Sequence, residues 1–275
     1  MASESPFAVV ICHGSYHTPA PYQPLLDALA ARGVEAYCPQ RPTCDLSRLN
    51  VGDVNNPDFD REPPVGGYPT AADDAASVGE LLDRLIVEGK SILLVGHSSG
   101  GWVAAEAAQR ERHAKTRTSN GETGGIIGLF FIGALVIPIG ESVSSFFQPR
   151  DGNVVVPPFM RFHENGLGVM VDLAKYLFSD AGEGAASEWA QSMTAAPNMT
   201  SPLTHDPYDL PCAYVILDRD MCLPKEVQQS MIDLQNKKNP RPFTVYHAPC
   251  GHSPHITWTE GLAQVIEKFC SGILQ

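Results

Sequence analysis

A serine stands in a glycine-flanked turn between an apolar run and a helix-like segment. The residues Gly96-His97-Ser98-Ser99-Gly100 follow SILLV (91–95) and precede WVAAEAAQR (102–110). A Gly-x-Ser-x-Gly turn between a strand and a helix exposes the serine hydroxyl at the carboxyl edge of a sheet, where a base can activate it. The five-residue pattern also fits a plain strand–helix turn, so the prediction depends on the flanking segments. The flanking apolar run and helix-like segment predict that Ser98 is a nucleophile. They also predict that the backbone N–H of Ser99 donates to the oxyanion that forms when Ser98 attacks a carbonyl.

A second oxyanion donor is expected from the loop after an early strand. The first apolar run, FAVVIC (7–12), ends directly in His13-Gly14-Ser15-Tyr16-His17. We assign the second donor to the backbone N–H of Ser15, with Gly14 permitting close approach of the chain. His13 is expected to support this loop rather than take part in the chemistry.

Acid and base candidates follow two later predicted strands, in the chain order Ser, Asp, His. The strand AYVIL (213–217) ends at Asp218 and Asp220, and FTVYH (243–247) leads to His252. His252 is preferred to His247 and His255 as the base, because it lies past the strand in a Gly-flanked loop. It would take the proton of Ser98, while an aspartate orients the imidazole. Strand position alone does not separate Asp218 from Asp220.

These residues need a sheet whose strands end at a common edge, and the apolar pattern predicts one. Short apolar runs alternate with amphipathic helices, which indicates a parallel sheet covered on both faces. We predict an α/β fold, a mostly parallel doubly wound sheet with an inserted helical cap. The core comprises 1–136 and 210–275, and the cap 137–209, a segment rich in Phe, Met and Trp. The other predicted segments are a surface excursion at 39–68, helices at 22–32, 71–87, 102–112, 224–235 and 257–269, an exposed loop at 110–125, and strands at 34–38 and 125–132.

With these residues in place, the chain resembles the α/β-hydrolase branch that contains plant methylesterases and hydroxynitrile lyases. The resemblance rests on HGSYHTPAPYQPLLDAL (13–29), VGHSSGG (95–101), ILDRDMCLP (216–224) and GHSPHI (251–256). It implies the α/β-hydrolase fold and the acid that precedes a Leu-Pro pair, which selects Asp220, and it supports His252. It also implies a substrate contact at His17, beside Gly14. Ser99 and Gly101 differ from several relatives, and 110–125 looks like an insertion.

Composition restricts the partners of the chain. The formal net charge of −12 argues against nucleic acid or an anionic membrane as the main partner. The first apolar run is too short for a signal peptide or a membrane span, and seven widely spaced cysteines fit reduced thiols, so a cytoplasmic location is expected. No His pair with a metal-site spacing and no phosphate-binding loop is present, so neither a metal nor a cofactor is expected. The oligomeric state is left open.

Three functions fit this pattern. The first is hydrolysis of an ester, or a related acyl bond, of a small and largely apolar molecule under an apolar cap. The second is a lyase or cyclase in which the same three residues act as an acid–base relay and Ser98 is never acylated. The third is a ligand receptor on a hydrolase scaffold, which an intact Ser-His-Asp set disfavours.

Overall fold

A six-stranded parallel sheet forms the centre of the molecule. The computed structural model describes residues 7–149, 151 and 153–274; the first six residues, which the sequence assigns to the core, lie outside this range. The strand order is β2-β1-β3-β4-β8-β9, and each neighbouring pair is parallel. The strands are β1 (Ala8–Cys12), β2 (Glu35–Tyr37), β3 (Ser91–His97), β4 (Gly125–Ile132), β8 (Cys212–Leu217) and β9 (Thr244–Ala248). The predicted α/β class and parallel sheet are confirmed.

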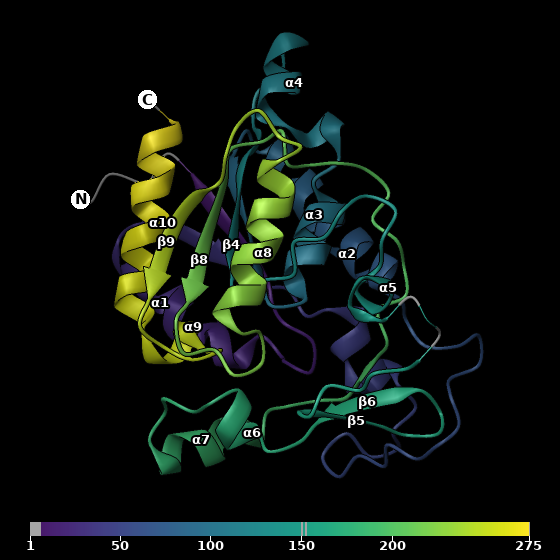
Figure 1. Cartoon of the computed structure of the whole chain (residues 1–275). Coiled ribbons are helices and arrows are strands. Elements are labelled where there is room, and N and C mark those ends of the chain that lie inside the picture. The colour runs from purple at the N-terminus through teal and green to yellow at the C-terminus, as the bar shows by residue number, and fades with distance from the viewer. Residues whose placement is uncertain (1–6, 150, 152, 275) are drawn as a thin grey trace.

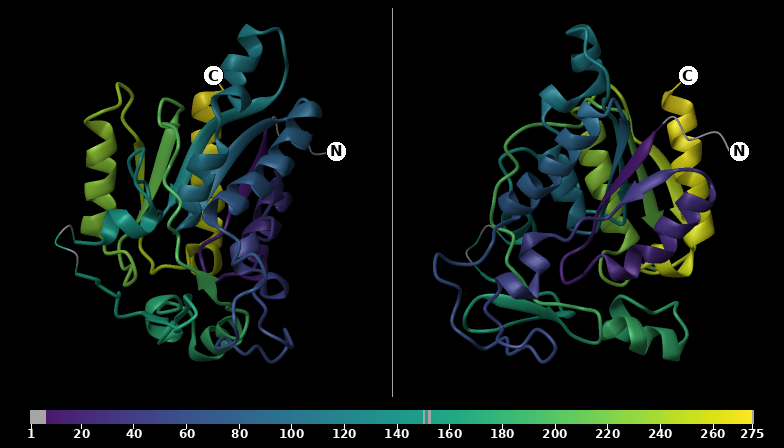
Figure 2. Two further views of the ribbon diagram at one scale, coloured as in Figure 1. Left: turned by 90° about the vertical axis from the view of Figure 1, so that its right-hand side faces the viewer. Right: turned by 180° about the vertical axis from the view of Figure 1, so that it is seen from behind.

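Helices cover both faces of this sheet (Figures 1 and 2). On one face, α1 (Gln23–Ala31) and α10 (Thr259–Ile273) pack around Leu25, Leu262 and Phe130. On the other, α2 (Ala71–Val87), α3 (Gly100–Ala107) and α8 (Lys225–Asn236) pack around Leu82, Trp102 and Ile232. The two apolar clusters give the doubly wound layering that the alternating pattern predicts. No helix of the described part of the chain is both long and apolar enough to cross a membrane.

The segment around 102–125 differs from its prediction. The helix that starts at the serine turn was predicted to reach Arg112, but α3 ends at Ala107. The carbonyl of Ala108 then accepts hydrogen bonds from the imidazoles of His113 and His205. The predicted exposed loop contains a 3-10 helix, η4 (Arg110–Arg112), and the short helix α4 (Ala114–Ser119). No residue of α4 is buried, so the sequence carries no apolar period there.

The inserted segment closes over the carboxyl ends of the strands (Figure 1). Its helices are α5 (Val143–Phe147), α6 (Leu173–Tyr176), α7 (Glu183–Ala190), and its strands are β5 (Met160–Phe162), β6 (Leu167–Met170) and β7 (Ala196–Pro197). The strands form an antiparallel sheet that sequence analysis did not predict. They are two to four residues long, too short to show the alternation from which a strand is recognised. The cap is therefore mixed rather than purely helical.

Candidate active site

Ser98 lies at the sharp turn between β3 and α3. Its backbone has a φ of 53°, in the left-handed region that non-glycine residues rarely adopt. The turn is held by hydrogen bonds from Ser98 N to the Ile132 carbonyl (3.2 Å) and from Leu135 N to the Ser98 carbonyl (2.9 Å). Such strain persists only where the surrounding structure fixes it, and it is typical of functional turns.

The glycines of this turn are required by close backbone approach. A Cβ atom on Gly100 would lie 2.0 Å from the Cys12 carbonyl oxygen, and one on Gly96 would lie 2.6 Å from the Gly101 Cα. Both distances are shorter than any real Cβ contact. The Gly-x-Ser-x-Gly pattern thus brings the turn directly against the end of β1, where the predicted oxyanion loop begins.

The acid and base candidates meet beneath the cap. His252 Nδ1 lies 2.7 Å from Asp220 Oδ2, and both side chains are buried. Asp220 Oδ1 accepts the backbone N–H groups of Cys222 (2.8 Å) and Leu223 (2.9 Å). Because an ionised carboxylate only accepts hydrogen bonds, the Nδ1 proton stays on His252 and Nε2 keeps the lone pair that a general base needs.

The ring of His252 lies close to the serine turn. Its centroid is 4.9 Å from that of His97, the residue before Ser98. Within the described part of the chain, the Ser98 hydroxyl forms no hydrogen bond with His252. In enzymes without substrate this bond is often long, and it tightens in the Michaelis complex.

The rejected alternatives lie elsewhere. Asp218 pairs with His247 (2.9 Å), and both side chains are substantially exposed. His255 is buried and stacks on the Tyr22 ring, with centroids 4.1 Å apart. The structure therefore places Asp220 with His252 and Asp218 with His247 of β9.

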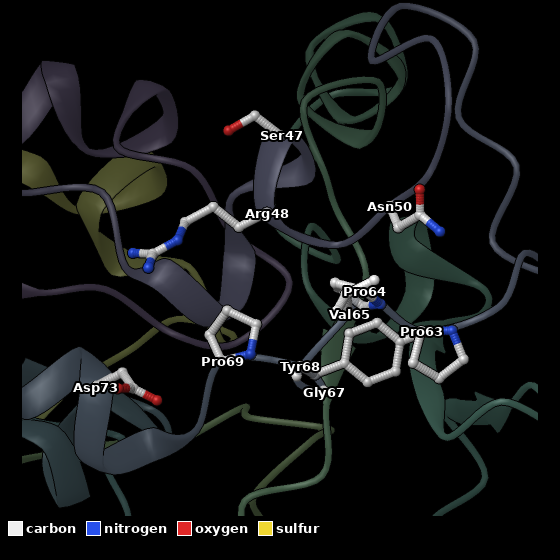
Figure 3. Close-up of a pocket in the computed structure, with 11 residues that line it drawn as sticks. Ser47, Arg48, Asn50, Pro63, Pro64, Val65, Gly67, Tyr68, Pro69 and Asp73 are labelled. Atoms are coloured by element: carbon white, nitrogen blue, oxygen red, sulfur yellow. The ribbon is translucent and has the colours of Figure 1, made fainter.

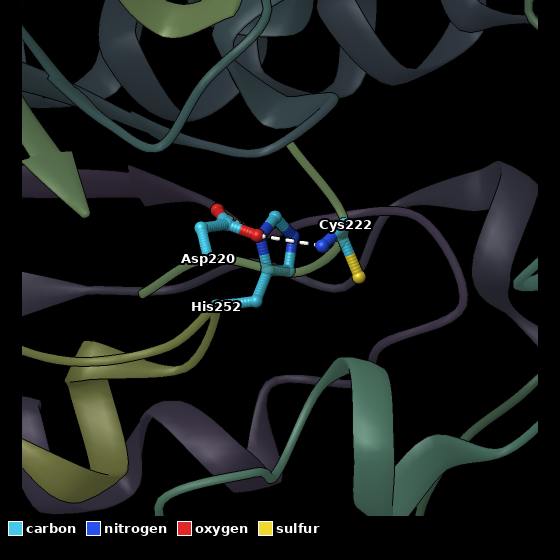
Figure 4. Close-up of side chains that lie close together, drawn as sticks. All are labelled: Asp220, Cys222 and His252. Carbon is cyan, nitrogen blue, oxygen red and sulfur yellow. Dashed lines mark hydrogen bonds and ion pairs between the residues drawn. The ribbon is translucent and has the colours of Figure 1, made fainter. Parts of the chain in front are cut away.

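Cys222 adjoins the Asp220–His252 pair, and the potential ligand atoms of the three residues lie within 4.8 Å of one another (Figure 4). The Cys222 thiol donates to the Tyr176 carbonyl (3.2 Å), and burial raises its pKa, so the sulfur stays protonated. The carboxylate and the Nδ1 atom already bond each other. We interpret the cluster as a hydrogen-bonded acid–base pair with a neighbouring thiol.

The predicted oxyanion loop lies against the serine turn. A Cβ atom on Gly14 would lie 3.2 Å from both Ser98 Cβ and His17 Nδ1, so only glycine leaves this approach relaxed. The Ser15 backbone N–H, predicted as an oxyanion donor, donates to the Ser99 hydroxyl at 2.7 Å. His17 Nδ1 bonds the Ser15 carbonyl (2.9 Å), and its buried Nε2 has no hydrogen-bond partner among the described residues. His17 Nε2 is therefore a buried acceptor, on a ring whose centroid lies 5.8 Å from that of His97 in the serine turn.

A tyrosine and a histidine that sequence analysis did not assign connect these loops. The Tyr22 hydroxyl accepts the Gly14 N–H (3.0 Å) and donates to His97 Nδ1 (2.5 Å). His97 Nε2 then donates to the His252 carbonyl (2.8 Å). The oxyanion loop, the serine turn and the base loop are thus joined by one chain of hydrogen bonds.

The buried imidazoles make stability depend on pH. Burial lowers the pKa of His13, His97 and His255 well below 6.5, and that of His17 to about 3. Below pH 6.5 these rings therefore bind fewer protons in the folded protein than in the unfolded chain. The free energy of unfolding therefore decreases as the pH falls below about 6.5, by up to about 1.4 kcal/mol per pH unit for each ring.

We expect urea unfolding at pH 7.5 and pH 5 to show this loss. His255→Phe keeps the stack on Tyr22 and removes one titrating ring, so its stability should fall less steeply than that of the parent. Equal slopes for the two proteins would contradict the assignment of a neutral buried His255.

A buried ion pair lies behind the oxyanion loop. Arg41 and Asp74 have fully buried side chains, and Nη2 of the arginine lies 2.8 Å from Asp74 Oδ2. The other arm of the guanidinium, Nη1, donates to the His13 carbonyl (2.8 Å) and to the Ser99 hydroxyl (3.0 Å). The segment 39–68, predicted as a surface excursion, therefore begins inside the molecule, and only its later part is largely exposed.

The sequence carries a signal for one member of this pair, Asp74. Asp74 precedes Val78, Leu82 and Leu85 at the spacing of one helix face, and all four are buried on α2. A carboxylate in an apolar stripe requires a buried partner. No such signal marks Arg41, which stands in a polar, Pro-rich stretch.

Breaking this pair should destabilise the fold. Asp74→Asn removes the negative charge and leaves Arg41 buried without a counter-ion, at an expected cost of about 3–5 kcal/mol. Urea unfolding at pH 7.5 measures it. As a control, Asp83→Asn on the same helix removes the partly exposed pair with Arg112 and should cost less than about 1 kcal/mol. Similar losses for both variants would contradict the distinction.

A surface hollow of about 590 Å³ lies in the segment 47–73 (Figure 3). It is lined by Ser47, Arg48, Asn50, Pro63, Pro64, Val65, Gly66, Gly67, Tyr68, Pro69 and Asp73. None of the predicted site residues is among these, so the hollow is not the candidate active site.

Comparisons with known proteins agree with this fold. A sequence model of the alpha/beta hydrolase family matches residues 9–265. The chain is 25% identical over 267 residues to the alpha/beta hydrolase nvfD of Aspergillus novofumigatus, covering 95% of each protein.

Two solved structures share the fold. A pyrethroid hydrolase from Sphingobium faniae has a TM-score of 0.68 and 20% identity, covering 96% of this chain and 97% of that one. The methylesterase MES16 from Arabidopsis has a TM-score of 0.63 and 16% identity, covering 96% and 99%. The chain belongs to the alpha/beta hydrolase family, and the resemblance to plant methylesterases is confirmed.

Proposed function

We propose that the protein is a serine hydrolase that cleaves an ester, or a related acyl bond, of a small and largely apolar molecule. The observation that carries this proposal is the buried Asp220–His252 pair (2.7 Å) beside the strained turn that holds Ser98. The pyrethroid hydrolase and the methylesterase among the similar structures support ester cleavage. The reaction needs no metal or cofactor.

The proposed reaction follows from the tautomer of His252. Its Nε2 takes the proton from Ser98 Oγ as this oxygen attacks the carbonyl carbon, and the carbonyl oxygen becomes an oxyanion. When the tetrahedral intermediate collapses, the imidazolium returns the proton to the departing alcohol and leaves an acyl group on Ser98. Water, deprotonated by the same nitrogen, then releases the acid. The Asp220 carboxylate stabilises the imidazolium in both halves of the reaction.

The cap supports an apolar substrate. Leu177, Phe178 and Trp189 of the cap form one apolar cluster with Cys222 and Ile256, which adjoin the acid and base loops. A second cluster joins Tyr16 of the oxyanion loop to Met160 and Met170 of the cap strands. Small-ligand sites are predominantly lined by side chains of this kind.

A covalent probe and an ester series test the proposal. A fluorophosphonate should add once to Ser98, as located by peptide mass spectrometry, and p-nitrophenyl acetate and butyrate should be turned over with a burst of p-nitrophenol if deacylation is slow. Labelling of Ser98 without turnover of any ester would favour the lyase or cyclase alternative. Neither labelling nor turnover, with tight binding of a small molecule, would favour the receptor.

A further inference from the structure

The Ser99 hydroxyl has three polar neighbours, and their chemistry determines the direction of each hydrogen bond. Ser15 N (2.7 Å) and Arg41 Nη1 (3.0 Å) both carry hydrogen and can only donate to Ser99 Oγ. A hydroxyl has two lone pairs, so these donors occupy both. The third neighbour is Ser15 Oγ at 2.7 Å. The Ser99 hydrogen must therefore be donated to Ser15 Oγ.

This order of donors changes what Ser15 offers to a substrate. Its backbone N–H is already used on Ser99, whereas its hydroxyl accepts from Ser99 and keeps its own hydrogen. Among the described residues, the other hydrogen-bond partner of that hydroxyl is Met199 Sδ at 3.7 Å. A thioether sulfur is a weak acceptor. The Ser15 hydroxyl thus holds a strong donor that the protein leaves poorly satisfied.

Ser15 lies beside the nucleophile. It directly follows Gly14, whose Cα faces Ser98 so closely that an added Cβ would lie 3.2 Å from Ser98 Cβ. Ser15 is half-buried. We propose that the Ser15 hydroxyl, rather than its backbone N–H, donates to the substrate oxyanion, together with the backbone N–H of Ser99. This inference rests on the proposed function, and it makes Ser15 a catalytic residue in its own right.

Arg41 serves in this proposal as a positioning residue. Its guanidinium is held by Asp74 through Nε (2.9 Å) and Nη2 (2.8 Å), so Nη1 has a fixed direction toward Ser99. A charged donor makes a stronger hydrogen bond than a neutral one. Arg41 therefore keeps the Ser99 hydroxyl accepting, so the Ser15 hydroxyl accepts from Ser99 and keeps its own hydrogen for another acceptor.

Variants of Ser15 separate the hydroxyl from the backbone. Ser15→Ala keeps the backbone N–H and should lower kcat on p-nitrophenyl butyrate by a factor of about 100, the usual effect of losing one oxyanion donor. Ser15→Thr restores a hydroxyl and should recover most of that loss. Ser91→Ala, at the far end of β3 from the turn, is the matched control and should remain within a factor of about two of the parent, as changes away from a functional feature usually do.

The double variant gives a result that a structural defect would not. Removing the Ser99 hydroxyl releases the Ser15 N–H, so Ser15→Ala with Ser99→Ala should be more active than Ser15→Ala alone. Activity of Ser15→Ala within threefold of the parent would overturn the inference, as would equal losses in the Ala and Thr variants, or no gain in the double variant. If the parent neither reacts with a fluorophosphonate nor cleaves esters, the proposed function fails as well. An active parent with an unaffected Ser15→Ala variant overturns this inference alone.

Discussion

Ser98→Ala should lower kcat for ester cleavage by about 10⁶-fold, the size of loss seen when a triad serine is removed from a hydrolase. The variant has no oxygen that could attack the carbonyl, while the Asp220–His252 pair and both oxyanion donors stay in place. Alanine tolerates a φ of 53° about as well as serine does, so the fold should be retained. Steady-state kinetics on p-nitrophenyl butyrate measure the loss.

The controls distinguish loss of the nucleophile from loss of structure. Thermal unfolding of Ser98→Ala should match that of the parent, and fluorophosphonate labelling should disappear. Ser91→Ala on the same strand should be labelled and active. Retention of more than a thousandth of the parent activity in a sample free of parent protein would rule out Ser98 as the acylated residue.

Asp220→Asn should lower kcat by about 10⁴-fold, because an amide favours the wrong tautomer of the imidazole. The replacement is isosteric, and the asparagine Oδ1 can still accept the Cys222 and Leu223 N–H groups that shape the loop. Its NH₂ group would then face His252 Nδ1 and donate to it, so the ring proton moves to Nε2 and the base is lost.

Asp218→Asn is the matched control, two residues away on the same loop. Its carboxylate pairs with the exposed His247, and exposed pairs contribute at most about 1 kcal/mol. Its kcat should stay within threefold of the parent. If Asp218→Asn and Asp220→Asn were equally impaired, the assignment of Asp220 as the partner of the base would be wrong.

Much of the fold followed from local sequence patterns. The α2 helix spans the range that its apolar period predicts. In the structure Thr70 and Asp73 form a capping box at its start, and Gly89, with a φ of 79°, follows its last turn. The strands β3 and β4 are continuous apolar runs, as strands buried on both faces must be. The cap strands were missed because two to four residues carry no period, and their pairing depends on residues brought together by the loops.

The sequence by itself placed Ser98 in its turn, Ser15 after β1, and an acid and a histidine after β8 and β9. Local pattern and chain order suffice for that, because parallel strands deliver their following loops to one edge. Which aspartate faces which histidine was open from strand position, since Asp218 and Asp220 differ only in how the loop turns. The tertiary structure pairs Asp220 with His252 and leaves Asp218 to His247.

The tertiary structure alone also revealed the partners of the oxyanion loop. Arg41, Asp74 and Ser99 stand far apart in the chain, and their hydrogen bonds exist only after the segment from Arg41 to Cys44 is buried beneath the loop. A sequence pattern predicts the helix or strand on which a side chain lies, but it does not predict the direction in which a hydroxyl donates its hydrogen. That direction is decided by which donors already occupy its lone pairs, and here it turns Ser15 from a backbone contributor into a side-chain donor.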